Sequence, residues 1–188
     1  MLAIRLSTLA CMRRNSVQLA NHANKISNAG KSFSAEHAVL ETMPAPGSPF
    51  HLAFPVHNLE VARQFYGNVL GCAEGRSSSK WQDYSLAGHQ IVCHWVGEDY
   101  RCQDYYNPVD GDEVPVPHHG LALTKPEFDA LAARLNDHKI DFIIPPTLRF
   151  EGMPGEQWTM FFKDPSGNNL EFKAMSHPEN LFIKYNVK

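Results

Sequence analysis

The chain has 188 residues, of which 43% are hydrophobic and 20% charged, and its formal net charge at neutral pH is −3. This composition is typical of one globular domain with an appendage, and it excludes a wholly disordered or collagen-like chain. No apolar run reaches the ~18 residues of a membrane-spanning helix, and the acidic balance argues against a dedicated nucleic-acid-binding protein. Ten histidines are a first indication of metal or proton chemistry.

The first 35 residues differ in charge from the rest of the chain. Residues 1–35 contain five basic side chains and no acidic one, whereas the remainder has 12 basic and 20 acidic side chains. This basic, serine-rich and weakly amphipathic segment is typical of a mitochondrial transit peptide, so we expect the mature protein in the mitochondrial matrix. The alternative is a disordered N-terminus. Residues 36–48, which end in a proline-rich stretch, are predicted to be a linker.

The body of the chain opens with a short buried strand followed by a helix. Residues 51–56 are mostly apolar, and Asn58 is a suitable N-cap for the helix. An apolar stripe at helical spacing then runs to Gly71, which fits the position just beyond a helix end. Residues 81–86 and 90–96 are predicted to be strands.

The same order recurs in the second half of the body. A strand is predicted over residues 118–123, and the capping box Thr124-Lys125-Pro126-Glu127 predicts the start of a helix. Further strands are predicted over residues 142–144, 158–162 and 169–172, the last two on either side of the tight turn at 164–168.

The body therefore consists of two copies of one unit, at about residues 49–97 and 114–175. Units that cannot each close a core are expected to pack together. The acidic residues 98–113 between them are predicted to be a solvated connector, and residues 176–188 a C-terminal tail.

Two long segments of this body resemble a known superfamily. The segments HLAFPVHNLEVARQFYGNVLGC and MFFKDPSGNNLEFKAM are similar to those of the vicinal-oxygen-chelate superfamily, which includes glyoxalases, bleomycin-resistance proteins, epimerases and extradiol dioxygenases. With GHQIVCHW and VPVPHHGLAL, they most resemble small bacterial extradiol-type dioxygenases. The resemblance covers residues 49–175. It implies an α+β fold in which two βαβββ modules form curved sheets around a metal-binding cavity.

The resemblance also implies a set of metal ligands. Transferred position by position, they are His51, His118 and Glu171. His118 is preferred to His119 because it aligns with His51, and because adjacent side chains of a strand face opposite ways. Two imidazoles and one carboxylate are the facial triad that binds Fe(II), which we therefore favour as the cofactor; the same ligands also suit Zn, Co, Ni or Mn. Each histidine could instead be a core residue with satisfied hydrogen bonds.

A fourth ligand, common in glyoxalase-type members, is not predicted. Superposing the two units places Val92 opposite Glu171, and valine cannot bind a metal, which mildly disfavours a glyoxalase reaction. His94 falls on the same strand face as Gln90, so it is a candidate catalytic acid/base, with a buried structural histidine as the alternative.

Two residues are candidates for substrate binding, Gln90 and Arg149. Arg149 precedes a glycine- and proline-rich segment at a predicted cavity mouth, where a guanidinium could bind an anionic group. Its alternative role is an ion pair with Glu151 or Glu156.

Three functions remain open from the sequence. The first is a metal-dependent dioxygenase that uses O₂ on a small vicinal-oxygen, for instance catecholic, substrate. The second is a redox-neutral lyase, isomerase or epimerase that uses a divalent metal and an enediolate. The third is a protein that binds a small molecule without chemistry. Two complete modules allow a cavity within one chain, and a homodimer is equally compatible with the sequence.

Overall fold

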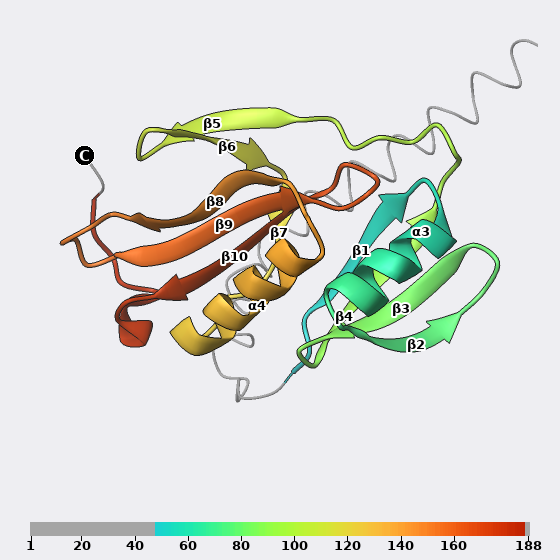
Figure 1. Cartoon of the computed structure of the whole chain (residues 1–188), viewed down its shortest axis with the longest axis horizontal. Helices are drawn as coiled ribbons and strands as arrows, with labels where there is room; N and C mark the ends of the chain where they lie inside the picture. Colours follow the sequence, from blue (N-terminus) through green and yellow to red (C-terminus); the bar gives the residue numbers. More distant parts are fainter. Residues whose placement is uncertain (1–47, 187–188) are drawn as a thin grey trace, which may run out of the picture. The chain divides into compact units, whose positions relative to one another are not determined.

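The computed structural model describes residues 48–186 (Figure 1). The predicted transit peptide and the predicted linker up to residue 47 lie outside these residues. The described part has an α+β fold with two four-stranded sheets and one two-stranded sheet. None of its helices is both long and apolar enough to cross a membrane.

The first module is built on a sheet with the strand order β1-β4-β3-β2. The Asn58 side chain accepts hydrogen bonds from the backbone N–H groups of Glu60 and Val61, which confirms the predicted N-cap. The helix ends before Gly71, whose φ of +76° costs glycine no strain. In chain order the elements are β1 (His51–Val56), α3 (Leu59–Arg63), the π-helix η1 (Gln64–Val69), β2 (Ala73–Ser77), β3 (Trp81–Leu86) and β4 (His89–Trp95).

The second module repeats this plan with the strand order β7-β10-β9-β8. The capping box is confirmed, because Glu127 accepts a hydrogen bond from the backbone N–H of Thr124 at 2.9 Å. The order of strand, helix and three strands confirms the predicted repeat. The elements are β7 (His118–His119), α4 (Lys125–Asp137), β8 (Phe142–Arg149), β9 (Gln157–Lys163) and β10 (Asn169–Met175), followed by a short 3-10 helix η2 (Pro178–Asn180).

Alternation along the strands separates an apolar face from a polar face in each sheet. In β1, Phe54 and Val56 enter the apolar core, while His51 lies on the other face. In β10, Phe172 enters the same core, while Glu171 lies on the other face. The core is shared by both modules, and the polar faces carry the residues that the sequence singles out.

The turn between β9 and β10 fastens the second module to the first. Asp164 accepts hydrogen bonds from the Tyr66 hydroxyl at 3.0 Å and from the backbone N–H groups of Ser166 and Asn168 at 2.8 Å. The Asn168 amide donates to the Pro55 carbonyl of β1 at 3.0 Å. These contacts give the DPSGN segment a structural role in joining the two modules.

The predicted connector includes most of a β-hairpin. Strands β5 (Tyr105–Val109) and β6 (Asp112–Val116) pair around Asp110 and Gly111, whose φ angles are +50° and +86°. Two consecutive residues with positive φ form the hairpin turn that an Asp-Gly pair favours. This pair is the sequence signal from which the hairpin could have been predicted.

The hairpin packs on the second module. Val114 of β6 forms a small apolar cluster with Ile144 of β8 and Phe161 of β9. Figure 1 shows β5 and β6 running alongside β8. Most of the other hairpin side chains are exposed, which explains why their polar sequence reads as a connector.

Two other strands differ from the sequence prediction. Strand β2 is not predicted, because its five residues are all exposed and show no apolar alternation. Strand β7 has two residues where six are predicted. A Cβ atom added at Gly120 would lie 1.7 Å from the Glu171 carbonyl oxygen, so only glycine lets the chain leave β7 so close to β10.

Candidate metal centre

The structure brings His118 and Glu171 together at the edge of the second sheet. Their strands β7 and β10 are parallel neighbours, and His118 Nε2 lies 3.3 Å from Glu171 Oε2. The other ring nitrogen, Nδ1, is 2.6 Å from the Pro115 carbonyl oxygen. Because a carbonyl only accepts, Nδ1 carries a proton, and Nε2 is the nitrogen available to a ligand or to the carboxylate.

Glu171 is a buried carboxylate held in its ionised form. Thr159 Oγ1 donates to Glu171 Oε1 at 2.8 Å, and Lys173 Nζ lies 3.1 Å from Oε2. Burial by itself raises the pKa of Glu171, but the hydrogen bond from His118 and the charge of Lys173 outweigh it and bring the pKa to about 2. The Glu171 carboxylate in turn raises the pKa of His118, although burial opposes this. The pair therefore shares a proton that a metal cation would replace.

His51 lies apart from this pair within one chain. It is an exposed residue of the first sheet, and its Nδ1 is 2.8 Å from Gln90 Oε1. Among residues 48–186, no three histidine, cysteine, aspartate or glutamate side chains converge in a way that could hold a metal. The ligand role of His51 therefore stays a prediction, because residues 48–186 of one chain do not bring it together with His118 and Glu171 in a three-ligand site.

The strand registers show which positions of the two modules correspond. His51 pairs with Gln90, and Val92 lies two residues further along β4. His118 pairs with Asn169, and Glu171 lies two residues further along β10. Val92 thus occupies the position of Glu171 in the first module, as the sequence comparison of the two units predicts, and that module offers no carboxylate there.

The other predicted site residues lie elsewhere. His94 is exposed on the same face of β4 as Gln90, in line with the prediction, and its catalytic role stays a prediction. Both ends of the Gln90 amide are already hydrogen-bonded. Its oxygen lies 2.8 Å from His51 Nδ1, and its nitrogen donates to Asp83 Oδ2 at 2.9 Å.

Arg149 does not lie at an open cavity mouth. It is 4% exposed, and its guanidinium donates to the Val109 carbonyl of the hairpin. Its Nε lies 3.7 Å from the Asp112 carboxylate and 3.9 Å from that of Asp110. The structure thus corrects both sequence interpretations, because Arg149 anchors the β5–β6 hairpin and pairs with neither Glu151 nor Glu156. These partners lie about 40 residues away in the chain, where local sequence gives no signal.

Sequence reasoning also missed Thr159 and Asp83. Thr159 is fully buried beside Glu171, and Asp83 is 5% exposed beside Gln90. Both lie on β-strands that neighbour the site strands, and neither belongs to a motif. Because the sequence does not show that these two strand positions are buried, it carries no signal that could have drawn attention to them.

His119 confirms the expected alternation and provides a test of the fold. Its ring packs on Phe54 with centroids 4.9 Å apart, away from Glu171, and burial lowers the pKa of His119 from 6.5 to about 4. Between pH 6.5 and about 4, the His119 ring takes up a proton in the unfolded chain but not in the folded chain. The contribution of neutral His119 to the free energy of unfolding is therefore complete above pH 6.5 and is lost as the pH falls toward 4. We expect His119→Leu to remove roughly 1–3 kcal/mol of this pH-dependent loss of stability.

The measurement is urea unfolding of wild type and variant at both ends of that pH range. Taking the difference between the two proteins cancels the contributions of other groups, including the opposite contribution of His118. Equal pH dependence in both proteins would contradict the assigned environment of His119.

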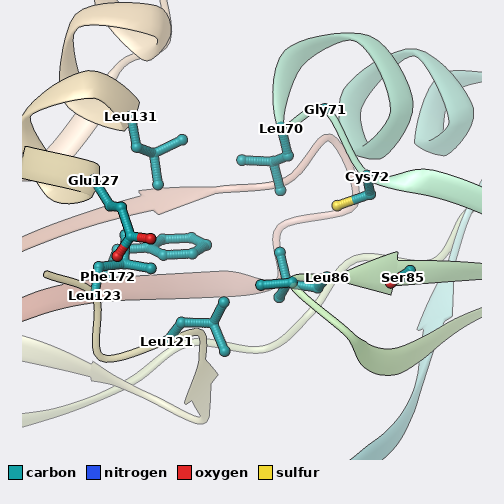
Figure 2. A pocket seen from close by; sticks show the side chains of 11 residues that line it. Leu70, Gly71, Cys72, Ser85, Leu86, Leu121, Leu123, Glu127, Leu131 and Phe172 are labelled. Carbon is teal, nitrogen blue, oxygen red and sulfur yellow. The ribbon is translucent and has the colours of Figure 1, made fainter. Parts of the chain in front are cut away.

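An apolar pocket of about 200 Å³ lies between the modules, and neither His118 nor Glu171 lines it. Figure 2 shows side chains of both modules around it, among them Leu70 and Leu86 of the first and Leu131 and Phe172 of the second. Its one carboxylate, Glu127, is engaged in the capping box. Its one thiol, Cys72, has a pKa that burial raises to about 11, so the metal-binding thiolate form is disfavoured and the pocket offers mainly packing surface.

Comparisons with known proteins agree with the fold. Residues 48–172 match the family model described as Glyoxalase/Bleomycin resistance protein/Dioxygenase superfamily. A crystal structure described as a glyoxalase/bleomycin resistance protein/dioxygenase from Alicyclobacillus acidocaldarius is 31% identical, covers 74% of this chain and all of its own, and superposes with a TM-score of 0.63. The chain therefore belongs to the glyoxalase/bleomycin resistance/dioxygenase superfamily.

More distant structures share the fold alone. The fosfomycin resistance protein FosX from Listeria monocytogenes is 20% identical over 72% of this chain and 99% of its own, with a TM-score of 0.53. Lactoylglutathione lyase from Agrobacterium tumefaciens is 19% identical over 74% of this chain and 99% of its own, with a TM-score of 0.51. No curated protein matched the sequence.

Proposed function

We propose that the protein is a metal-dependent, dioxygenase-like enzyme whose site uses His118 and Glu171 of one chain and His51 of a second copy. The observation that carries the proposal is the pairing of a correctly protonated imidazole with an ionised, buried carboxylate, 3.3 Å apart. Two ligand atoms in adjacent positions about 2.1 Å from one metal lie roughly 3 Å apart, so this pair fits a shared divalent ion.

The position of His51 is the reason for proposing that a second copy of the chain supplies the third ligand. Its Nδ1 is held by Gln90, which leaves Nε2 as the ring nitrogen available to a metal, and the residue is exposed. A two-fold symmetric dimer in which each chain offers His51 to the other would build two identical sites from one contact. We therefore propose a homodimer, in which His51 of each chain would complete the triad of the other.

The residues around the pair suit a small oxygen-rich substrate. Fe(II) held by two histidines and one carboxylate supplies open positions for vicinal substrate oxygens and for O₂. Lys173 places a positive charge beside Glu171, where it can bind an anionic substrate oxygen. His94 lies on the polar face that carries His51, where it can move a proton. We further propose, from the composition of residues 1–35, that the enzyme works in the mitochondrial matrix.

The experiment is anaerobic reconstitution with Fe(II) followed by O₂-uptake measurements across a panel of catechols. We expect substrate-dependent O₂ uptake and a substrate-induced spectral change in the wild type, and neither in His118→Ala. Uptake by both proteins, or by neither, would contradict the proposal.

The second candidate is a redox-neutral lyase or isomerase. The same residues suit it because Zn, Co, Ni and Mn accept the same ligands, and the superfamily includes lyases such as that of Agrobacterium tumefaciens. Turnover that needs Zn, Co or Ni and proceeds without O₂ would select it. Metal analysis of protein from its native source separates the two.

A further inference from the structure

We infer that Gln90 and Asp83 are positioning residues that fix the tautomer of His51 and aim its Nε2 outward. The inference deepens the proposed function, on which the ligand role of His51 rests. It assigns to Gln90 a role different from substrate binding, and to Asp83 a role that sequence reasoning did not find.

Three side chains form a hydrogen-bonded chain behind His51. His51 Nδ1 lies 2.8 Å from Gln90 Oε1, and Gln90 Nε2 lies 2.9 Å from Asp83 Oδ2. Arg76 closes the chain, with Nε and Nη2 each 3.0 Å from the same carboxylate oxygen. The strand registers permit this chain, because β1, β4 and β3 are successive neighbours in the sheet.

The direction of every bond in this chain is fixed from one end. The Asp83 carboxylate only accepts, so the Gln90 amide must present its NH₂ group to it. The amide oxygen then faces His51 and also only accepts, so Nδ1 of the histidine must carry the proton. Nε2 is left with its lone pair, and this is the state in which a histidine can bind a metal through Nε2.

The exposure of Asp83 and Arg76 fits a role in orienting Gln90. Asp83 is 5% exposed, whereas the Arg76 side chain that pairs with it is 77% exposed. A buried carboxylate costs stability unless it is well bonded, and Asp83 is bonded to Arg76 on one side and to the Gln90 amide on the other. In His118 the Pro115 carbonyl likewise holds a proton on Nδ1, so Nε2, which faces Glu171, is the nitrogen that a metal would take in place of their shared proton. The first module has Val92 at the position of Glu171, and its polar strand residues Gln90 and Asp83 form the hydrogen bonds behind His51.

The test measures the tautomer of His51 in the metal-free chain and, separately, metal affinity. Long-range ¹H–¹⁵N correlation spectra, recorded where the ring is neutral, are expected to show the proton of His51 on Nδ1 in the wild type. In Gln90→Leu the proton is expected to move to Nε2, the form that a free imidazole prefers. Competition with a chelating dye is expected to show Co(II) binding weakened by about 10–100-fold. Asp83→Asn, whose amide no longer dictates the orientation of Gln90, is expected to give a mixture of tautomers.

Glu74→Gln is the matched control. Glu74 lies on the neighbouring strand β2 and pairs with Arg63 at 3.1 Å, outside the chain behind His51. It is expected to leave the His51 tautomer and the Co(II) affinity unchanged. A wild-type His51 protonated on Nε2, or an unchanged tautomer in Gln90→Leu, would overturn the inference. A wild type with the expected tautomer that binds no divalent metal would refute the proposed function while leaving the positioning role in place.

Discussion

Glu171→Gln is expected to bind divalent metal at least ~100-fold more weakly than the wild type, because loss of a charged ligand costs more than loss of an outer-shell partner. The amide keeps the size of the side chain but loses the negative charge that attracts both the metal and Lys173. Dye competition with Co(II) measures the loss. Glu156→Gln is the control, because this carboxylate binds the backbone N–H of Gly152 in a loop at 2.8 Å. Equal affinity in Glu171→Gln and wild type would remove Glu171 from the site.

The same variant tests whether two copies share each site. His51→Ala alone is also expected to lose metal binding, since the proposed site takes one histidine from each chain. A mixed dimer of His51→Ala and Glu171→Gln chains has one site with all three ligands and one with neither His51 nor Glu171. Random exchange of equal amounts should therefore restore about a quarter of the wild-type sites. A mixture that binds no more metal than its components would place His51 and Glu171 in one site of a single chain.

The sequence predicts the orientation of individual strand residues better than the way in which the sheets assemble. Alternation within strands and the repeat of the two modules place His118 toward Glu171 and His119 away from it, and the structure agrees. The repeat also equates Val92 with Glu171, which the strand registers confirm. These features follow from local periodicity. Whether His51 meets the other two residues depends on how whole sheets pair, and local periodicity carries no information about that.

Arg149 shows the second limit of the sequence. Its neighbours in the chain suggest a partner in Glu151 or Glu156, yet its guanidinium reaches Asp110, Asp112 and the Val109 carbonyl. A long flexible side chain contacts whatever the fold brings within reach, and here that is a hairpin whose polar residues indicated a connector. Asp83 was missed for a related reason, because a single buried carboxylate in a strand resembles a solvent-facing residue until the neighbouring strands are known.

Asp164→Ala is expected to lower the free energy of unfolding by about 3–5 kcal/mol, which makes it the most damaging of the proposed substitutions to the fold. Asp164 is 4% exposed and accepts four hydrogen bonds, from Tyr66 Oη, Asn168 Nδ2 and two backbone N–H groups. Its loss leaves the Tyr66 hydroxyl and the two backbone N–H groups without this acceptor, while Asn168 Nδ2 keeps its bond to the Pro55 carbonyl. Each orphaned donor costs about 1–3 kcal/mol, although such costs do not add fully.

Two further variants make this prediction specific. Tyr66→Phe removes the hydroxyl that is one of the four donors, so only one lone pair of the Asp164 carboxylate loses its partner. The free energy of unfolding is expected to fall by about 1 kcal/mol. Asp141→Ala, at an exposed position before β8, should change stability by less than about 0.5 kcal/mol. Urea unfolding of the three variants measures the series. If Asp164→Ala were no more damaging than Tyr66→Phe, Asp164 would not be the residue that joins the modules, and the Asn168 bond to the Pro55 carbonyl would carry that role.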